Sequence, residues 1–310
     1  MGGATTRHKI LRESRTIAGD LAPDGNISWK VGHGRSLTIG NRGHLMAIVN
    51  VTPDSFSDGG RFVDSDLAVS HALACVSAGA SILDIGGEST RPGAVERSAA
   101  EEQDRVLPVI QELARVTEAL ISIDTYHAET ARLALAAGAH IVNDVHGLQR
   151  EPEIAKVVAE AGAGLCIMHT GRGRENTILP DMIADQRVFF ERSLAIANAA
   201  GVAEDSIVLD PGFGFAKNGA EDLQLMARFS ELKSLGLPWL VGTSRKRFIG
   251  TVTEQEHAGD RDIGTAATTV ILRLAGAAIF RVHNVATNRE ALAMADAVLA
   301  ARARMEDETR

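Results

Sequence analysis

Eight short apolar runs alternate with eight amphipathic stretches along most of this chain, and this alternation restricts the possible folds more than any other feature. The apolar runs span residues 45–51, 82–85, 120–123, 141–142, 164–168, 207–209, 239–241 and 277–282. The amphipathic stretches span residues 66–78, 99–116, 128–137, 153–161, 185–200, 221–235, 261–274 and 288–304. The first kind is typical of buried strands and the second of helices. Eight strand–helix units in strict order predict a single (β/α)8 barrel, and a doubly wound open sheet is the competing layout.

Glycines and the flanking segments set the limits of this predicted barrel. Glycines that suit a left-handed helix C-cap follow six of the helical stretches, at Gly79, Gly138, Gly162, Gly201, Gly236 and Gly276. Residues 1–26 show no clean period, which predicts a mobile extension. Two short β-like stretches within residues 27–44 predict a hairpin beneath the barrel floor. We therefore expect one domain over residues 27–304 and a C-terminal tail over residues 305–310.

Composition excludes several classes of partner. The chain has 32 Lys and Arg against 40 Asp and Glu, and its formal net charge of −8 argues against nucleic acid as a broad partner. No apolar run reaches the roughly 18 residues of a membrane span, and the charged N-terminus does not resemble a signal peptide. Cys75 and Cys166 both lie in apolar runs, as buried free thiols do in a reducing compartment. We expect a cytoplasmic protein without disulfides.

Polar residues stand at the ends of the apolar runs. They are Asn50, Glu88, Asp124, Asn143, Asp144, His169, Asp210, Ser244, Arg281 and His283. In a barrel all strand ends converge on one rim, where enzymes of this fold place their active sites. A single Asp or Asn after a strand is about as often a helix cap or turn former. Because polar residues recur at all eight strand ends, we interpret the rim as an active site.

The expected neighbours on this rim indicate an anion pocket. The eighth strand closes against the first, so Arg281 and His283 would lie beside Asn50. Two donors that can carry positive charge next to an amide are typical of a phosphate or pyrophosphate site.

The opposite side of the rim indicates a different ligand group. Asp124, Asn143 and Asp210 offer acceptors deep in a narrow mouth, and buried carboxylates need donors. A flat heterocycle with adjacent N–H and NH2 groups would supply them, and Lys246 would donate to a carbonyl or ring nitrogen on it. The pattern thus predicts a planar, amine-rich ring joined to a phosphate-type leaving group.

Two long motifs and several short ones resemble dihydropteroate synthase, a pterin-binding barrel family. The long motifs are Asn50-Val51-Thr52-Pro53-Asp54-Ser55-Phe56-Ser57-Asp58-Gly59-Gly60 and Asp84-Ile85-Gly86-Gly87-Glu88-Ser89-Thr90-Arg91-Pro92-Gly93. The short blocks follow in the family's order at residues 123–125, 142–145, 210–217, 244–246 and 281–283. The resemblance covers residues 45 to about 300. It implies a transferase of folate biosynthesis, a sulfonamide target, that joins 6-hydroxymethyl-7,8-dihydropterin pyrophosphate to 4-aminobenzoate in a homodimer with Mg²⁺.

The resemblance also implies a role for individual residues. It assigns the pterin to Asp124, Asn143, Met168, Asp210, Phe215 and Lys246. It assigns the aminobenzoate to Phe56, Thr90, Arg91, Pro92, Phe213, Ser244 and Arg247. It assigns the pyrophosphate to Asn50, Arg91, Arg281 and His283, with Asn50 also contacting Mg²⁺. The implied catalytic set is Asn50, Asp124, Lys246, Arg281 and His283. For Phe56 and Phe213 an ordinary packed loop phenylalanine is the alternative interpretation.

The leaving group predicts the mechanism. Pyrophosphate departs from a methylene on an electron-rich ring, so an SN1-like path is expected, with electrostatic stabilisation as the main task. An aromatic amine is already unprotonated at neutral pH, so neither a covalent nucleophile nor a strong base is required. We expect residues 52–60 to form a mobile cover that completes the site when substrate binds.

Two departures from the family pattern and two rival functions remain. Residues 170–176 replace the usual family loop, and their role stays open. Arg247 stands where many relatives carry Ser, and we hypothesise that it alters affinity for aminobenzoate at a helix N-terminus. The rivals are a methyltetrahydrofolate-binding methyltransferase barrel and a non-catalytic pterin-binding paralogue. The second long motif disfavours the first rival, and the cations Arg281 and His283 disfavour the second.

Overall fold

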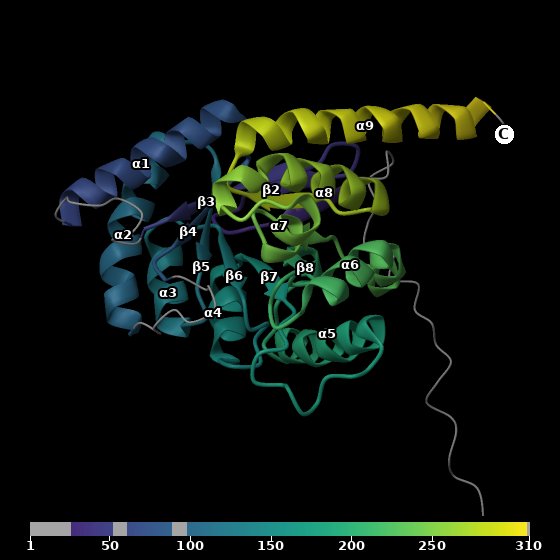
Figure 1. Cartoon of the computed structure of the whole chain (residues 1–310). Helices are drawn as coiled ribbons and strands as arrows, with labels where there is room; N and C mark the ends of the chain where they lie inside the picture. Colours follow the sequence, from purple (N-terminus) through teal and green to yellow (C-terminus); the bar gives the residue numbers. More distant parts are fainter. Residues whose placement is uncertain (1–25, 52–60, 89–97, 309–310) are drawn as a thin grey trace, which may run out of the picture.

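A computed structural model of the chain describes residues 26–51, 61–88 and 98–308. Eight parallel strands form one sheet in the order β8-β7-β6-β5-β4-β3-β10-β9. The strands are β3 (His44–Asn50), β4 (Ile82–Gly86), β5 (Leu120–Asp124), β6 (Ile141–Asp144), β7 (Gly164–Met168), β8 (Ile207–Asp210), β9 (Leu240–Val241) and β10 (Ile279–Val282). A parallel bridge between Leu209 and Trp239 joins the two ends of this order. The sheet therefore closes into the predicted barrel, and the open-sheet alternative is wrong (Figure 1).

Helices surround the strands, as the alternation of the sequence predicts (Figure 1). They are α1 (Arg61–Ala78), α2 (Ala99–Val116), α3 (Ala128–Ala136), α4 (Glu153–Ala161), α5 (Met182–Ala199), α6 (Gly219–Ala227), α7 (Arg247–Thr253), α8 (Asp262–Ala275) and α9 (Val285–Glu308). Each of the six capping glycines has a positive φ, as predicted. Short 3-10 helices add the segments 204–206, 229–235 and 258–261.

Three details differ from the sequence-based expectation. The stretch 221–235 is not one helix, because α6 gives way to a 3-10 helix whose Phe229 and Leu232 are buried at the three-residue spacing of that helix. Helix α7 was not expected, since its seven residues are too few to show a period. Helix α9 continues to Glu308, beyond the expected start of the C-terminal tail.

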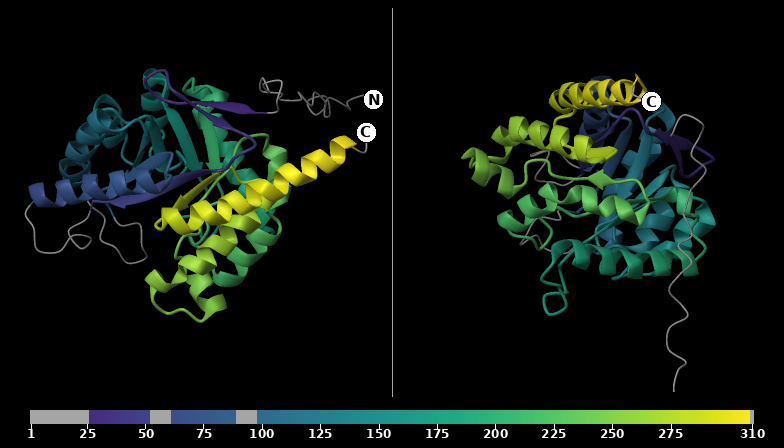
Figure 2. Two further views of the ribbon diagram at one scale, coloured as in Figure 1. Left: turned by 90° about the horizontal axis from the view of Figure 1, so that it is seen from above. Right: turned by 90° about the vertical axis from the view of Figure 1, so that its right-hand side faces the viewer.

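The predicted hairpin is present and lies across the floor of the barrel (Figure 2). Strands β1 (Ile27–Lys30) and β2 (Ser36–Ile39) pair antiparallel. Trp29 and Val31 are buried among side chains from the lower parts of the barrel strands, including Met46 and Ile141. The indole of Trp29 donates to the carbonyl of Ser206 at 2.9 Å. The hairpin thus closes the end of the barrel opposite the strand-end rim.

Other expectations concern burial and membrane insertion. Cys75 and Cys166 are both buried free thiols, and burial raises the pKa of each. In the described ranges no helix is long and apolar enough to cross a membrane. The predicted N-terminal extension lies outside the described residues except for Asn26.

Candidate active site

The carboxyl ends of the first four barrel strands place polar residues at one level. Asn50 pairs in register with Gly86, Gly86 with Asp124, and Asp124 with Asn143. Because Gly86 has no side chain, the position its Cβ would take is 3.7 Å from Asp124 Oδ2 and 3.8 Å from Asn50 Oδ1. Asn50 and Asp124 therefore face the same notch, and the predicted convergence of strand ends is confirmed for them.

A pocket opens at this rim. It is lined by Asp124, Asn143, Val145, Met168, Asp210, Gly212, Phe215, Gly242, Lys246 and Arg281. Every residue that the resemblance assigns to the pterin belongs to this lining. Val145, Met168 and Phe215 also pack together with Tyr126, which gives the pocket one apolar side beside its charged side. Such a combination suits a flat ring with polar edges.

Arg281 crosses the pocket to two carboxylates. Its Nε lies 2.6 Å from Asp84 Oδ2, and its Nη2 lies 2.6 Å from Asp124 Oδ2. Burial disfavours the guanidinium charge, but the two carboxylates raise the pKa of Arg281 above its usual value. The expected separation of a cationic side from a carboxylate side is therefore wrong for this residue, because the narrow barrel brings β10 within reach of β4 and β5.

Buried acceptors face the pocket from three strands. Asn143 donates from Nδ2 to Asp84 at 3.1 Å, and its Oδ1 is buried without a hydrogen-bond partner among the described residues. Asp210 accepts from the backbone N–H of Gly212 at 2.8 Å through Oδ1. Burial raises the pKa of Asp210 to about 6. Burial also raises the pKa of Asp124, against the opposing effect of Arg281. The site thus holds acceptors that only partly find donors within the protein.

Lys246 stands over the apolar side of the pocket. Its Nζ lies 4.1 Å from the centroid of the Phe215 ring, a cation–π arrangement. Burial lowers the pKa of Lys246 to about 8, while the charge of Asp210 opposes that shift. Lys246 is also the N-cap residue of α7, so the helix start fixes its backbone beside the pocket. Lys246 therefore lies at the pocket as expected, and its role as a donor to a ring acceptor stays a prediction.

Ser244 and His283 contact each other at the same rim. Ser244 Oγ lies 2.9 Å from His283 Nδ1 and accepts from the backbone N–H of His283 at 3.1 Å. Ser244 is buried, which suits the positioning of His283 more than open contact with a ligand. Neither residue lines the pocket itself.

Two expected site residues have a different placement. Phe213 is fully buried in the main core, 6.3 Å from the ring of Phe248, so the packing interpretation holds and its assignment to the aminobenzoate site is corrected. Phe215, two residues further on, faces the pocket instead. Asp144 accepts from the N–H groups of His146 and Leu148, so it is a turn former.

Arg247 is the one remaining expected site residue that lies within the described ranges. Arg247 is exposed as the first residue of α7. Phe56, Thr90, Arg91 and Pro92 lie outside the described residues, as does the predicted cover over residues 52–60.

Asp84 is the site residue that the sequence reasoning left without a role. It is fully buried within β4 and accepts from both Arg281 and Asn143. A charged residue inside an apolar strand must be paired to be tolerated, and this signal was available in the sequence. The partners of Asp84 could not be identified from the sequence, because they come from strands distant in the chain.

The fold and site define a barrel enzyme with a pocket for a flat, donor-rich ring. Residues 46–283 match a family described as pterin binding enzyme. The dihydropteroate synthase of Synechocystis sp. is 45% identical over 264 residues, which cover 84% of this chain and 91% of that protein. The chain belongs to the dihydropteroate synthase family of pterin-binding enzymes.

Solved structures of the family have the same architecture. A Clostridium difficile dihydropteroate synthase crystallised in the presence of pteroic acid superposes with a TM-score of 0.81 at 45% identity, covering 84% of this chain and 98% of that one. The Xanthomonas albilineans dihydropteroate synthase with 4-aminobenzoic acid gives a TM-score of 0.81 at 42% identity, covering 86% and 96%.

Proposed function

We propose that this chain joins 6-hydroxymethyl-7,8-dihydropterin pyrophosphate to 4-aminobenzoate, forming 7,8-dihydropteroate and pyrophosphate. The observation that carries the proposal is the set of incompletely paired acceptors in the pocket, above all Asn143 Oδ1. A buried acceptor without a donor costs about 1–3 kcal/mol. The N–H and NH2 edge of a pterin would supply donors to Asn143, Asp210 and Asp124. Relatives solved in the presence of pteroic acid and with 4-aminobenzoic acid support a site for a pterin ring and for aminobenzoate.

The proposed reaction breaks the bond between the pterin methylene carbon and the pyrophosphate oxygen. The electron pair leaves with pyrophosphate, and the cation delocalises into the pterin ring. The carboxylates of Asp124 and Asp210 stabilise that cation. The amine nitrogen of aminobenzoate then forms the C–N bond and releases its proton to solvent. No covalent intermediate with the protein is needed.

Arg281 has two tasks in this scheme. Its guanidinium holds Asp124 in place, because the two groups are 2.6 Å apart. Its charge also lies at the rim where the leaving pyrophosphate accumulates negative charge, together with His283. A preorganised cation of this kind stabilises the transition state without reorganising solvent.

Mg²⁺ is part of the proposal through Asn50. The described segments contain no group of three or more His, Cys, Asp or Glu residues that could hold a metal. Mg²⁺ that binds together with phosphates takes most ligands from phosphate oxygens and water, so a single amide oxygen fits such a site. The ion would neutralise charge on the departing pyrophosphate.

The aminobenzoate would lie beside Phe215 and Lys246, with Arg247 at the neighbouring start of α7. Phe56, Thr90, Arg91 and Pro92 would complete this side. We further propose that the protein works as a homodimer in the cytoplasm and is inhibited by sulfonamides. Exposed apolar residues on α8 and α9, which pack against each other, support the dimer; they include Ile263, Ile271, Met294 and Val298.

The direct test is product formation. Purified protein is incubated with the dihydropterin pyrophosphate, 4-aminobenzoate and Mg²⁺, and dihydropteroate is measured by mass spectrometry. The Asn143→Ala variant, purified in the same way, is the matched control, because it lacks one acceptor of the pocket. Product from the native chain and much less from Asn143→Ala is expected. Folded native protein that forms no product would overturn the proposal.

A further inference from the structure

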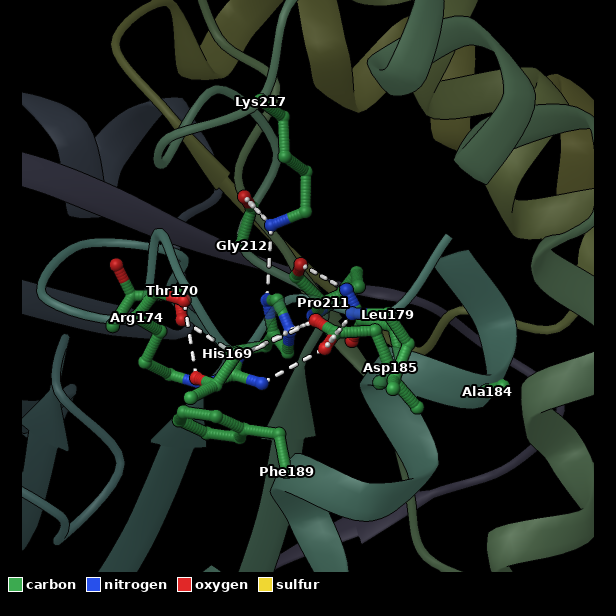
Figure 3. Close-up of polar contacts among 12 residues, drawn as sticks. His169, Thr170, Arg174, Leu179, Ala184, Asp185, Phe189, Pro211, Gly212 and Lys217 are labelled. Atoms are coloured by element: carbon green, nitrogen blue, oxygen red, sulfur yellow. Dashed lines mark hydrogen bonds and ion pairs between the residues drawn. The ribbon is translucent and has the colours of Figure 1, made fainter. Parts of the chain in front are cut away.

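Four polar or charged side chains from the segment after β7, from α5 and from the loop after β8 form a cluster (Figure 3), which contacts the pocket-lining residues Gly212 and Phe215. They are His169, Arg174, Asp185 and Lys217. The side chains of His169 and Asp185 are each 4% exposed, and that of Arg174 is 12% exposed. None of the four lines the pocket or takes part in the proposed chemistry. Buried charges that the reaction does not use require another explanation.

The contacts of His169 fix its protonation. Its Nδ1 lies 3.0 Å from Lys217 Nζ, which can only donate, so Nδ1 must accept. Its Nε2 lies 2.8 Å from Asp185 Oδ2 and 3.2 Å from Arg174 Nη1. Because Nδ1 accepts, the neutral ring carries its proton on Nε2 and donates it to the Asp185 carboxylate. Burial, together with the charge of Lys217, lowers the pKa of His169 to about 4. His169 is thus a neutral ring that joins a carboxylate on one side to an ammonium on the other.

The ammonium group of Lys217 that contacts His169 also contacts the backbone of the pocket wall. Its Nζ donates to the carbonyl of Gly212 at 2.8 Å and lies 3.5 Å from the carbonyl of Phe215. With His169 these acceptors occupy all three N–H bonds of the ammonium. Gly212 and Phe215 both line the pocket, so Lys217 spans the back of the turn that they bound. That turn contains two glycines in the left-handed region, Gly212 and Gly214, and the next residue, Ala216, is a non-glycine residue in the same region. A non-glycine residue such as Ala216 stays in that region only when the surrounding structure supports it.

The loop that departs from the family pattern joins the cluster through Arg174. Its Nη2 lies 2.8 Å from Asp185 Oδ1, which also accepts from the backbone N–H of Leu179 at 3.0 Å. Arg172 of the same loop lies over the Phe215 ring, 5.0 Å from its centroid. The loop therefore contacts the pocket wall directly at Phe215 and indirectly through Asp185 and His169.

We propose that Lys217 is a positioning residue for the pterin pocket. It holds the turn from Gly212 to Phe215 in its binding geometry, and the chain from Arg174 through Asp185 and His169 holds Lys217. This inference rests on the assignment of the pocket to the pterin. Lys217 itself does not touch the substrate. It sets the position of Phe215, over which Lys246 lies, and of Gly212, whose N–H binds Asp210.

The test compares Lys217→Met with Lys156→Met, an exposed lysine on α4 that serves as the matched control. Affinity for 6-hydroxymethylpterin is measured by calorimetry, and KM for each substrate by steady-state kinetics. Loss of one charge-assisted bond in the turn predicts at least a roughly tenfold rise in the pterin Kd and KM for Lys217→Met. The aminobenzoate KM rises less than the pterin KM, because aminobenzoate would contact the turn only at Phe215, whereas the pterin pocket also depends on Gly212. Hydrogen exchange accelerates in residues 211–217 and not in α4.

Two further results decide the outcome. A Lys217→Met protein with unchanged pterin Kd, or with lower Tm and kcat but no selective loss of pterin affinity, would overturn the proposal. If Lys217→Met does not fold, Lys217→Gln keeps two donors and must show a smaller rise of the same selectivity. Asn143→Ala separates the two hypotheses. If it leaves the pterin Kd unchanged, the pocket assignment fails whatever Lys217 shows.

Discussion

Replacing Gly212 by Ala tests whether the turn after β8 is pressed against the end of β7. Gly212 has a φ of +65°, and a Cβ built on it would lie 1.9 Å from the backbone carbonyl oxygen of His169. The left-handed backbone alone costs a non-glycine residue about 1–2 kcal/mol. Overpacking against backbone adds about 1–3 kcal/mol, because the carbonyl cannot rotate away as a flexible side chain would. We expect Gly212→Ala to lower the free energy of unfolding by about 2–5 kcal/mol in all.

Gly162→Ala is the matched control for the backbone contribution. Gly162 caps α4 with a φ of +57°, and nothing lies within 4 Å of its Cβ position. The Gly162→Ala substitution should therefore lower the free energy of unfolding only by the backbone contribution, about 1–2 kcal/mol, and leave the pterin affinity unchanged. Urea unfolding gives the free energies, and calorimetry gives the pterin Kd. Equal destabilisation of the two variants, or unchanged pterin binding by a folded Gly212→Ala, would refute the reasoning.

Four further predictions follow from the same structure. Burial raises the pKa of Asp210 to about 6, so its carboxylate protonates as pH falls through 6; pterin Kd should rise below that pH, and Asp210→Asn should remove this dependence in calorimetric titrations. Trp29→Ala should lower the free energy of unfolding by about 3–5 kcal/mol in denaturant titrations while pterin Kd changes less than twofold, since the residue is buried at the opposite end of the barrel. Arg247→Ser should raise the aminobenzoate KM by up to about fivefold and leave the pterin KM unchanged, because an exposed cation contributes little; equal constants for both proteins would count against any role. Met294→Asp should yield a monomer by light scattering, since its side chain is 66% exposed on the expected dimer face; a dimer that persists would place the interface elsewhere.

Most of the secondary structure could be predicted from the sequence. Residues 99–116 and 153–161 form helices with the predicted bounds, and the strand at residues 164–168 also agrees. These features depend on local periodicity and on single residues such as Gly162, whose positive φ ends a helix. The strand-end polar residues were found for the same reason, since the end of an apolar run is a local signal.

Pairing between distant residues was decided by the tertiary structure. Nothing local to Arg281 indicates that it bridges Asp84 and Asp124, because those partners lie on strands that closure of the barrel brings opposite it. The choice between Phe213 and Phe215 as the pocket residue depends on how the intervening turn is wound. A two-residue shift in that turn exchanges a core position for a site position.

The polar residues at the strand ends were predicted from the sequence and are found at the rim of the barrel. The sequence by itself determined an eight-unit barrel, the end at which its site lies and the polar residues gathered there, because secondary structure and chain order are encoded over short distances. The tertiary structure alone decided which of these residues line the pocket, which contact one another, and that Lys217, His169, Asp185 and Arg174 form one cluster. Hydrogen bonds and ion pairs depend on distances of a few ångströms, and only the closed barrel sets those distances.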